Sequence, residues 1–241
     1  MFLDKGGKKI SKSLGNVITA QKWLEFGNSK SILLLLYKRI TGARELGFDD
    51  IPGLMNEYNE LEDTYFGRIK VDNQAKLTKL KGLYEYVNLL NPPKQSSTHV
   101  NYRLLIELTK IFKENRNERV MKKLIDYGVI KEEGNQEIQK LIEIAGNYSD
   151  EFDEQEKIEV ELDATAKKAI SLLITELQKE EDPEDVQNTI YQIAKGNDVQ
   201  PKDFFKILYQ IILGTSRGPK IGPFITDIGR KQVAKTLAEY V

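Results

Sequence analysis

The sequence contains no cysteine and only one histidine, His99, among its 241 residues. The lack of cysteine excludes disulfide frameworks, thiolate zinc sites and cysteine nucleophiles. A single histidine also excludes a multi-histidine metal site, and serine–histidine–aspartate catalysis would have to use His99. The longest purely apolar run, Ile32–Leu36, is far shorter than the roughly 18 residues that span a bilayer. Asp4 and several lysines stand where a signal peptide would be apolar, so we expect a cytoplasmic protein without a membrane segment.

The charges are distributed unevenly, although the formal net charge is only −1. Residues 1–131 contain 23 lysines and arginines against 15 acidic residues, whereas residues 132–241 contain 13 against 22. A basic half beside an acidic half suggests a polyanionic partner on one side only. Two solvated surfaces of opposite sign that merely keep the protein soluble would give the same composition. Charge alone therefore does not distinguish a polyanion-binding surface from a solvated one.

Apolar residues recur with the helical period along most of the chain. The stripe of Leu54, Tyr58, Leu61 and Tyr65 follows the i, i+4, i+7, i+11 pattern of one helix face. Similar stripes continue to the C-terminus, and strand signals are scarce. We therefore predict a mainly α protein with ten or more helices and short loops.

Local signals predict where several helices begin and end. Asp182 and Pro183 are typical of an N-cap followed by a first helical residue. Pro201 is expected to open the next helix and Gly214 to close it, and Gly146 is expected to end an earlier one.

A few segments do not fit a helix. Phe2–Leu3 could end a strand, and Lys157–Val160 could form a short edge strand. The acidic stretch Ser149–Asp163 lacks a sustained apolar stripe and is predicted to be a linker. Asn91–Ser97 contains two adjacent prolines and is predicted to break the helical pattern.

The most informative segment lies near the N-terminus. Lys8 and Lys9 precede Ser11, Lys12 and Ser13 in a stretch flanked by glycines at positions 6, 7 and 15. Such a loop can bend around an anion, with ammonium groups as point charges and hydroxyl and backbone N–H groups as donors. Phosphate is the natural ligand of such a loop, whereas composition alone would favour a solvated basic arm.

The order of these residues carries a resemblance. Lys9-Ile10-Ser11-Lys12-Ser13, followed by Leu14-Gly15-Asn16, resembles the Lys-Met-Ser-Lys-Ser signature loop of class I aminoacyl-tRNA synthetases. The resemblance implies ATP as the nucleotide: Lys9 and Lys12 would stabilise its phosphates while the amino acid attacks the α-phosphate, with Ser11 and Ser13 as supporting donors. Mg²⁺ would arrive with ATP, because no cluster of metal ligands is apparent in the sequence.

Further stretches narrow the resemblance to the class I lysyl-tRNA synthetases. Near the start these are Leu34–Arg39, Phe48–Pro52 and Tyr58–Gly67, and near the end they are Leu208–Gly214 and Arg217–Ile225. The resemblance implies a signature loop and stem-contact region over residues 1–70 and an α-helical cage that binds the anticodon over residues 71–241. It also implies tRNA(Lys) as the partner.

The departure from the family is large. A complete enzyme would carry an upstream Rossmann domain with a second signature motif and the lysine pocket, and the sole histidine at position 99 cannot supply that motif. We therefore expect this C-terminal portion, on its own, neither to activate lysine nor to charge tRNA. Lysine would bind only through the missing N-terminal domain.

Basic residues after the proline break are candidates for tRNA contact, because cations beside an aromatic suit single-stranded loops. His99 is expected to be a loop or cap histidine rather than a base-reading one. A glycine- and proline-rich turn near the C-terminus could grip a phosphate or simply join two packed helices. The candidate nucleic-acid-binding residues are Arg103, Arg116, Arg119, Lys122, Lys123, Arg217 and Lys220.

Two other interpretations stay open. The chain could be part of another class I synthetase, of the glutamyl or arginyl type, because the signature loop is shared. It could also be a non-enzymatic helical adaptor that binds tRNA and carries the N-terminal loop by coincidence.

Overall fold

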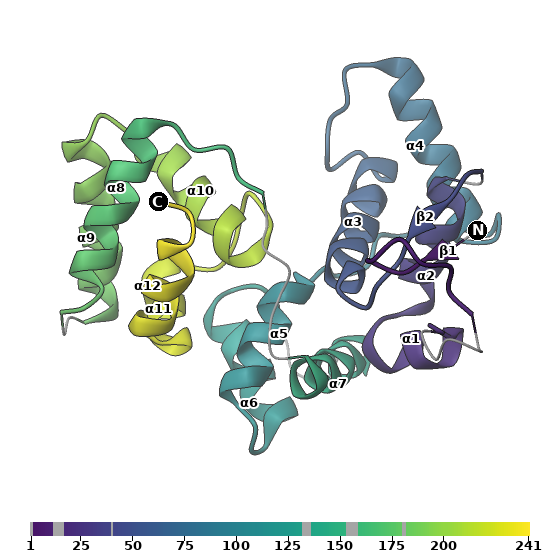
Figure 1. Cartoon of the computed structure of the whole chain (residues 1–241), viewed down its shortest axis with the longest axis horizontal. Coiled ribbons are helices and arrows are strands. Elements are labelled where there is room, and N and C mark those ends of the chain that lie inside the picture. Colours follow the sequence, from purple (N-terminus) through teal and green to yellow (C-terminus); the bar gives the residue numbers. More distant parts are fainter. Residues whose placement is uncertain (1, 12–16, 40, 132–135, 153–158, 180–181) are drawn as a thin grey trace. The chain divides into compact units, whose positions relative to one another are not determined.

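The computed structural model describes residues 2–11, 17–39, 41–131, 136–152, 159–179 and 182–241. Twelve helices and two short strands lie in these residues (Figure 1), which confirms the predicted mainly α fold. The chain divides into two compact units. The first comprises residues 1–102 and 140–155, and the second comprises residues 103–139 and 156–241. The functional division predicted at residue 70 stays a prediction.

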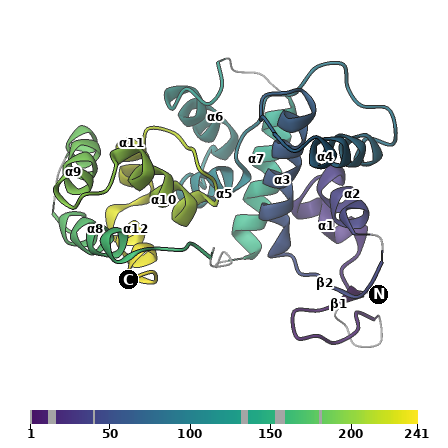
Figure 2. The ribbon, with the colours of Figure 1, turned by 90° about the horizontal axis from the view of Figure 1, so that it is seen from above.

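The first unit contains a three-helix core next to a small pair of strands. The strands β1 (Phe2–Leu3) and β2 (Arg44–Glu45) are parallel, with Phe2 opposite Arg44. Helices α2, α3 and α4 pack on one another (Figure 2). The helices of this unit are α1 (Ala20–Phe26), α2 (Ser29–Lys38), α3 (Asp50–Tyr65), α4 (Gln74–Val87) and most of α7 (Gln136–Glu151).

Buried aromatic residues join α1 to α7 within the first unit. Trp23 and Phe26 are both buried. The Trp23 indole N–H donates to Ser31 Oγ at 2.9 Å, so its one polar atom is satisfied. Phe26 meets Tyr148 edge-to-face with ring centroids 6.3 Å apart. Asn147 on α7 also donates to the Glu25 carbonyl at 3.1 Å, which fixes α7 against α1.

The second unit is a bundle around a continuous apolar core. Helix α9 packs against α8, α10 and α11, and α12 packs against α8 (Figure 1). The core includes Ile170, Leu173, Ile190 and Phe204, each fully buried. The helices of this unit are α5 (Tyr102–Ile111, after its first residue), α6 (Arg116–Asp126), α8 (Ala164–Glu176), α9 (Pro183–Gly196), α10 (Pro201–Leu213), α11 (Ile221–Ile228) and α12 (Arg230–Ala238).

The local helix signals are mostly confirmed. Helix α9 follows Asp182 as its N-cap, and α10 begins at Pro201 and ends at Gly214, whose φ of 68° is left-handed. The expected stop at Gly146 is wrong, because α7 continues through this buried glycine to Glu151. A glycine costs a helix only about 1 kcal/mol relative to alanine, and the packing of Tyr148 on the aromatic cluster outweighs that cost.

The segment after α7 differs in part from its prediction. The predicted linker from residue 149 begins later, because residues 149–151 are helical. The predicted edge strand over residues 157–160 is not formed at Glu159 and Val160, and its first two residues lie outside the described residues. The predicted break at Asn91–Ser97 is confirmed, since this stretch has no helix.

Candidate functional site

The segment that carries Lys9 starts as a small hairpin. The Asp4 N–H donates to the Lys8 carbonyl at 2.7 Å, and the Ile10 N–H donates to the Phe2 carbonyl at 3.1 Å. The Asp4 carboxylate closes the turn by accepting from the Gly6 and Lys8 N–H groups at 3.0 and 2.9 Å. Gly7 has a φ of 73°, which only glycine adopts without strain. The turn therefore has a fixed shape, and Lys9 is exposed on its outgoing arm.

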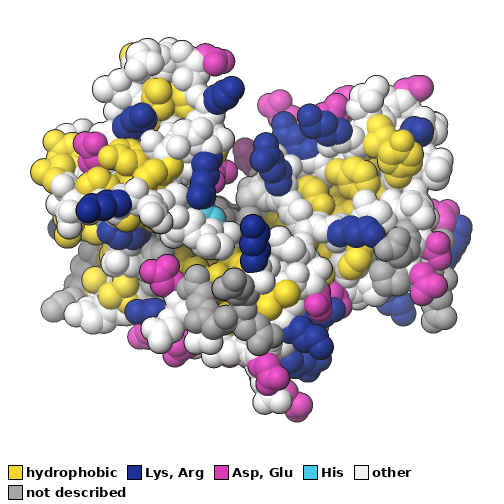
Figure 3. Space-filling model, turned by 180° about the vertical axis from the view of Figure 1, so that it is seen from behind, with side chains coloured by type: hydrophobic (Ala, Val, Ile, Leu, Met, Phe, Trp, Pro, Cys, Tyr) yellow, Lys and Arg dark blue, Asp and Glu magenta, His cyan; other side chains and the backbone are white. Residues whose placement is uncertain are grey.

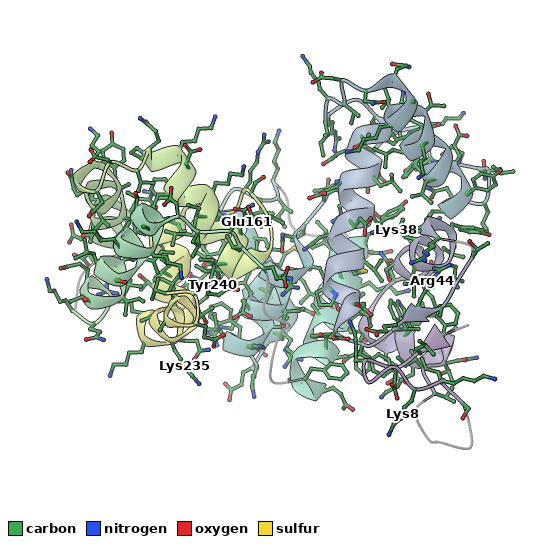
Figure 4. All side chains as sticks on the ribbon, turned by 45° about the horizontal axis from the view of Figure 1, so that its top comes forward. Lys8, Lys38, Arg44, Glu161, Lys235 and Tyr240 are labelled. Carbon is green, nitrogen blue, oxygen red and sulfur yellow. The ribbon has the colours of Figure 1, made fainter. Side chains whose placement is uncertain are left out.

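Lys5 connects this hairpin to the start of α3. Its ammonium lies 2.9 Å from Asp50 Oδ1 and 3.3 Å from Asp49 Oδ2. Partial burial by itself would lower the pKa of Lys5, but the hydrogen bond and charge of Asp50, with help from Asp49, raise it above its ordinary value. Arg44 donates to the Leu36 carbonyl at 3.2 Å and so caps α2, at the end that also carries Lys38 (Figure 4).

The remaining residues of the signature loop are only partly described. Ser11 is half-buried. Lys12 and Ser13 lie outside the described residues, so the proposed phosphate-binding arrangement of Lys9, Ser11, Lys12 and Ser13 stays a prediction.

A buried carboxylate holds the segment between α4 and α5 against α3. Glu62 is only 2% exposed. Its Oε1 accepts from the Ser97 N–H at 2.6 Å and from the Ser97 hydroxyl at 2.7 Å. His99 Nε2 lies 2.9 Å from the same oxygen, and the Tyr84 hydroxyl donates to Oε2 at 2.8 Å. His99 is thus a loop histidine, as expected, and it faces a protein carboxylate.

The environment of Glu62 keeps its side chain charged. Burial by itself would raise the pKa of Glu62, but hydrogen bonds from His99, Ser97 and Tyr84 outweigh burial and hold the pKa far below its ordinary value of 4.5. Two asparagines on the same helix continue the attachment: Asn59 donates to the Val100 carbonyl at 3.3 Å, and Asn56 accepts from the Tyr102 N–H at 2.8 Å.

The basic residues on and near α6 have different environments. Arg119 and Lys122 are exposed, and the Arg119 guanidinium lies 4.5 Å from the centre of the Phe112 ring. Lys123 is 2.9 Å from both carboxylate oxygens of Asp227 on α11. Tyr127 also donates to Asp227. Lys123 therefore has a structural partner that joins α6 to α11.

Two other predicted contacts on these helices are less accessible. Arg103 on α5 is 7% exposed and takes part in interactions within the protein. Arg116, at the start of α6, is half-buried.

The turn between α10 and α11 presents Arg217 and Lys220 at the surface. Both residues are exposed. The Tyr209 hydroxyl donates to the Pro219 carbonyl at 2.5 Å, and the Thr215 hydroxyl donates to the Arg217 carbonyl at 2.6 Å. A Cβ at Gly218 would lie 2.6 Å from two carbons of the Tyr209 ring, so only glycine fits there. The turn is thus a rigid support for two cations.

Comparison with protein families assigns both parts of the chain. The family model described as "tRNA synthetases class I (K)" matches residues 1–90. The model described as "Anticodon binding domain" matches residues 104–241. The chain belongs to the class I lysyl-tRNA synthetase family.

Curated relatives of this family support the same assignment. A lysine–tRNA ligase of Cenarchaeum symbiosum is 54% identical over 235 residues, which cover 97% of this chain and 44% of the relative. Lysine–tRNA ligases of Rickettsia akari and Rickettsia conorii are 30% and 29% identical, over 99% and 98% of this chain and 45% of each relative. The chain thus spans less than half the length of these relatives. The glutamyl and arginyl alternatives are set aside, because the matching family model is the lysine type.

Neither the surface hollow nor the metal-binding side chains of the described residues indicate an additional site. A shallow hollow of about 590 Å³ on the second unit is lined partly by Glu161 and Tyr240 (Figure 4), together with two further glutamates, and this acidic lining does not suit a polyanion. Within the described residues, no group of histidine and acidic side chains could hold a metal ion. None of the helices described here is long and apolar enough to cross a membrane.

Sequence reasoning missed two acidic residues that hold helices together, buried Glu62 and half-buried Asp227. Glu62 lies four residues after Tyr58 on the apolar stripe of α3, so its position on the buried face was a usable signal. Asp227 had no such signal, because its partner Lys123 is 104 residues away in the sequence.

Proposed function

We propose that this chain is the tRNA-binding part of a lysine–tRNA ligase, which attaches lysine to tRNA(Lys) with ATP through an aminoacyl-adenylate. The observation that carries the proposal is the order of the two family matches along one chain. The 54% identity to an archaeal lysine–tRNA ligase over 97% of the chain supports it further.

The N-terminal hairpin is suited to a role in binding the ATP phosphates. An exposed Lys9 on a turn closed by Asp4 can approach a phosphate without rearrangement of the backbone. Lys12 would provide a second charge, and Ser11 and Ser13 would donate hydrogen bonds. Mg²⁺ would come with the nucleotide. Lysine itself would bind to the part of the ligase that this chain does not contain.

Exposure ranks the proposed tRNA contacts. Arg119, Lys122, Arg217 and Lys220 are exposed on the part of the chain that matches the anticodon-binding model, so they are the preferred contacts. Arg116 is a weaker candidate because it is half-buried. Arg103 is buried and Lys123 is paired with Asp227, so we assign both a structural role ahead of a tRNA contact.

We retain the functional division of the chain as part of this proposal. Residues 1–70 would contain the signature loop and the stem-contact region, and residues 71–241 would form the helical cage that binds the anticodon. The purified chain is expected to give no ATP–pyrophosphate exchange, because the lysine pocket would lie in another part of the ligase.

The decisive experiment is binding of the purified chain to a tRNA(Lys) transcript at two salt concentrations, beside a transcript with an altered anticodon. We expect salt-sensitive binding, since each phosphate contact contributes roughly 0.7–0.9 to the slope of log K against log salt. We expect weaker binding to the altered transcript. An Arg217→Gln variant should weaken binding, whereas Lys235→Ala, an exposed lysine on α12, serves as the matched control.

The outcomes separate the interpretations. Equal binding to both transcripts would favour a helical adaptor without anticodon recognition. No binding to either transcript would contradict the tRNA-binding proposal. A pyrophosphate exchange signal from the chain alone would contradict the assignment of the lysine pocket to another part of the ligase.

A further inference from the structure

None of the tRNA contacts ranked above lies on α4, which falls within residues 71–241 but precedes the residues 104–241 that match the anticodon-binding model. Lys79 and Tyr86 are seven residues apart, so their side chains lie on the same side of the helix, and Gly82 lies between them. Both Lys79 and Tyr86 are exposed. This face belongs to the first unit and to the part of the chain that matches the class I synthetase model, not the anticodon-binding model.

The Tyr86 ring is held in place although most of it faces solvent. The residue is 57% exposed. The Tyr37 ring on α2 supports it, with centroids 6.0 Å apart and planes tilted by 36°. A supported, exposed aromatic ring is the arrangement on which an unpaired base stacks.

The backbone after α4 exposes two leucines at an energetic cost. Leu89 and Leu90 have φ values of 54° and 59°, a conformation that side-chain-bearing residues rarely adopt. They are 66% and 69% exposed. Buried Asn88 holds this turn, because it donates to the Tyr84 carbonyl at 2.9 Å and accepts from the Tyr58 hydroxyl at 3.2 Å. Such strain, maintained by buried hydrogen bonds, is characteristic of binding sites.

Gly82 gives this face a flat centre. A Cβ there would meet no atom within 4 Å, so internal packing does not require a glycine. Glycine in the middle of a helix is unfavourable relative to most other residues. Its presence leaves open space between Lys79 and Tyr86, which a planar ring can occupy.

The surrounding charge favours a polyanion. Residues 66–101 contain six lysines and arginines against two acidic residues. Figure 3 shows hydrophobic side chains at the surface of the part of the molecule that carries α2 and α4, with lysine and arginine side chains beside them. A protein partner would not require this basic surround, whereas nucleic acid would.

We propose that the face of α4 formed by Lys79, Gly82 and Tyr86, with Leu89 and Leu90 at its end, binds an unpaired base of tRNA outside the anticodon loop. This inference rests on the proposed function, because that function makes tRNA the partner. Tyr86 stacks on the base, Gly82 makes room for it, Lys79 contacts a neighbouring phosphate, and the two leucines pack against the exposed edge of the nucleotide.

The test compares two RNAs, the full tRNA(Lys) transcript and its isolated anticodon stem-loop, by fluorescence anisotropy with the full chain. Stacking on an aromatic side chain contributes about 1–3 kcal/mol per base, so Tyr86→Ala should weaken binding of the full transcript at least about fivefold. It should leave the stem-loop affinity unchanged. The matched control is Tyr191→Ala, an exposed tyrosine with Lys195 4.7 Å from its ring centre.

A second variant separates binding from folding. Gly82→Gln should fill the open space and weaken binding of the full transcript while leaving thermal stability unchanged or increased. Gly53→Gln, at an equally open helical position on α3, should change neither affinity. Unchanged affinity for the full transcript in both α4 variants would overturn the proposal. If the wild-type chain does not bind the stem-loop, that result would instead contradict the proposed anticodon function. Failure of the α4 proposal and failure of the anticodon proposal are therefore distinguishable.

Discussion

Replacing Glu62 by glutamine tests whether one buried carboxylate holds the segment before α5 in place. Glutamine has nearly the same shape, so it removes the charge while leaving the packing intact. The amide oxygen can occupy the position of Oε1 and keep the donors Ser97 and His99. The amide nitrogen would then face the Tyr84 hydroxyl, which can turn and accept a hydrogen bond.

The expected magnitude follows from the number of charged hydrogen bonds. Hydrogen bonds to a charged group contribute about 1.5–3 kcal/mol each, and neutral ones about 0.5–1.5 kcal/mol. Relief from burying a charge offsets part of this loss. We therefore expect Glu62→Gln to lower the free energy of unfolding of the first unit by about 2 kcal/mol. Glu62→Ala leaves several buried donors unpaired and should cost about 3–5 kcal/mol.

The single tryptophan allows unfolding of the first unit to be measured separately. Trp23 is fully buried in α1, so its fluorescence reports on unfolding of the first unit during urea titration. Hydrogen exchange at residues 96–100 should accelerate in both variants, since these residues include the donors to Glu62. Far-ultraviolet circular dichroism would follow all the helices of the chain for comparison.

The pH dependence provides the refutation. The folded-state pKa of Glu62 lies well below its ordinary value of 4.5, so its contribution is complete above about pH 4.5 and is lost as the pH falls toward the folded-state pKa. The difference in the free energy of unfolding between wild type and Glu62→Gln should therefore be constant near pH 7 and shrink below about pH 4.5. Equal stability of the two proteins at pH 7, or a difference that grows on acidification, would refute the reasoning.

Three further predictions concern the second unit. Gly218→Ala should lower the free energy of unfolding by about 1–3 kcal/mol, because the added methyl group would lie 2.6 Å from carbons of the Tyr209 ring; urea titration followed by circular dichroism measures this. Lys123→Ala should also reduce stability by leaving the Asp227 carboxylate without its ammonium partner. Lys122→Ala should leave stability unchanged. It should instead reduce the slope of log K for tRNA binding against log salt by roughly 0.7–0.9.

Controls keep these predictions separate. Gly53→Ala introduces a methyl group at an open position of α3, so it should be neutral or stabilising by up to about 1 kcal/mol. If it destabilises as much as Gly218→Ala, the steric argument fails. Equal effects of Lys122→Ala and Lys123→Ala on both stability and tRNA binding would contradict the distinction between an exposed and a paired lysine.

The helices were predictable because their signals are local. The stripe from Leu54 to Tyr65 repeats at the helical period, and Thr19 caps α1 by accepting from the Lys22 N–H at 3.1 Å. The prediction at Gly146 was wrong because the low helix propensity of glycine is outweighed by the packing of α7. That packing involves residues about 120 positions away in the sequence, such as Phe26. Sequence periodicity contains no information about that packing partner.

The candidate site was predictable in residue type but not in accessibility. Arg217 and Lys220 follow a pattern of glycine and proline that predicts a turn, and the structure places both on an exposed one. Lys122 and Lys123 are indistinguishable in the sequence, yet only Lys123 lies within reach of Asp227. Adjacent helical positions point about 100° apart, so one can face a neighbouring helix while the other faces solvent. Tertiary packing alone separates the two roles.

The same reasoning changes the meaning of the charge asymmetry along the chain. The first unit takes residues from both halves and contains 16 basic and 16 acidic residues, while the second contains 20 and 21. The basic and acidic halves therefore do not become basic and acidic units. A polyanion would be attracted by local groups, such as the exposed cations of α4, of α6 and of the turn around Gly218. Because each such group contains only a few charges, the proposed binding to tRNA should depend on base contacts as well as on phosphates.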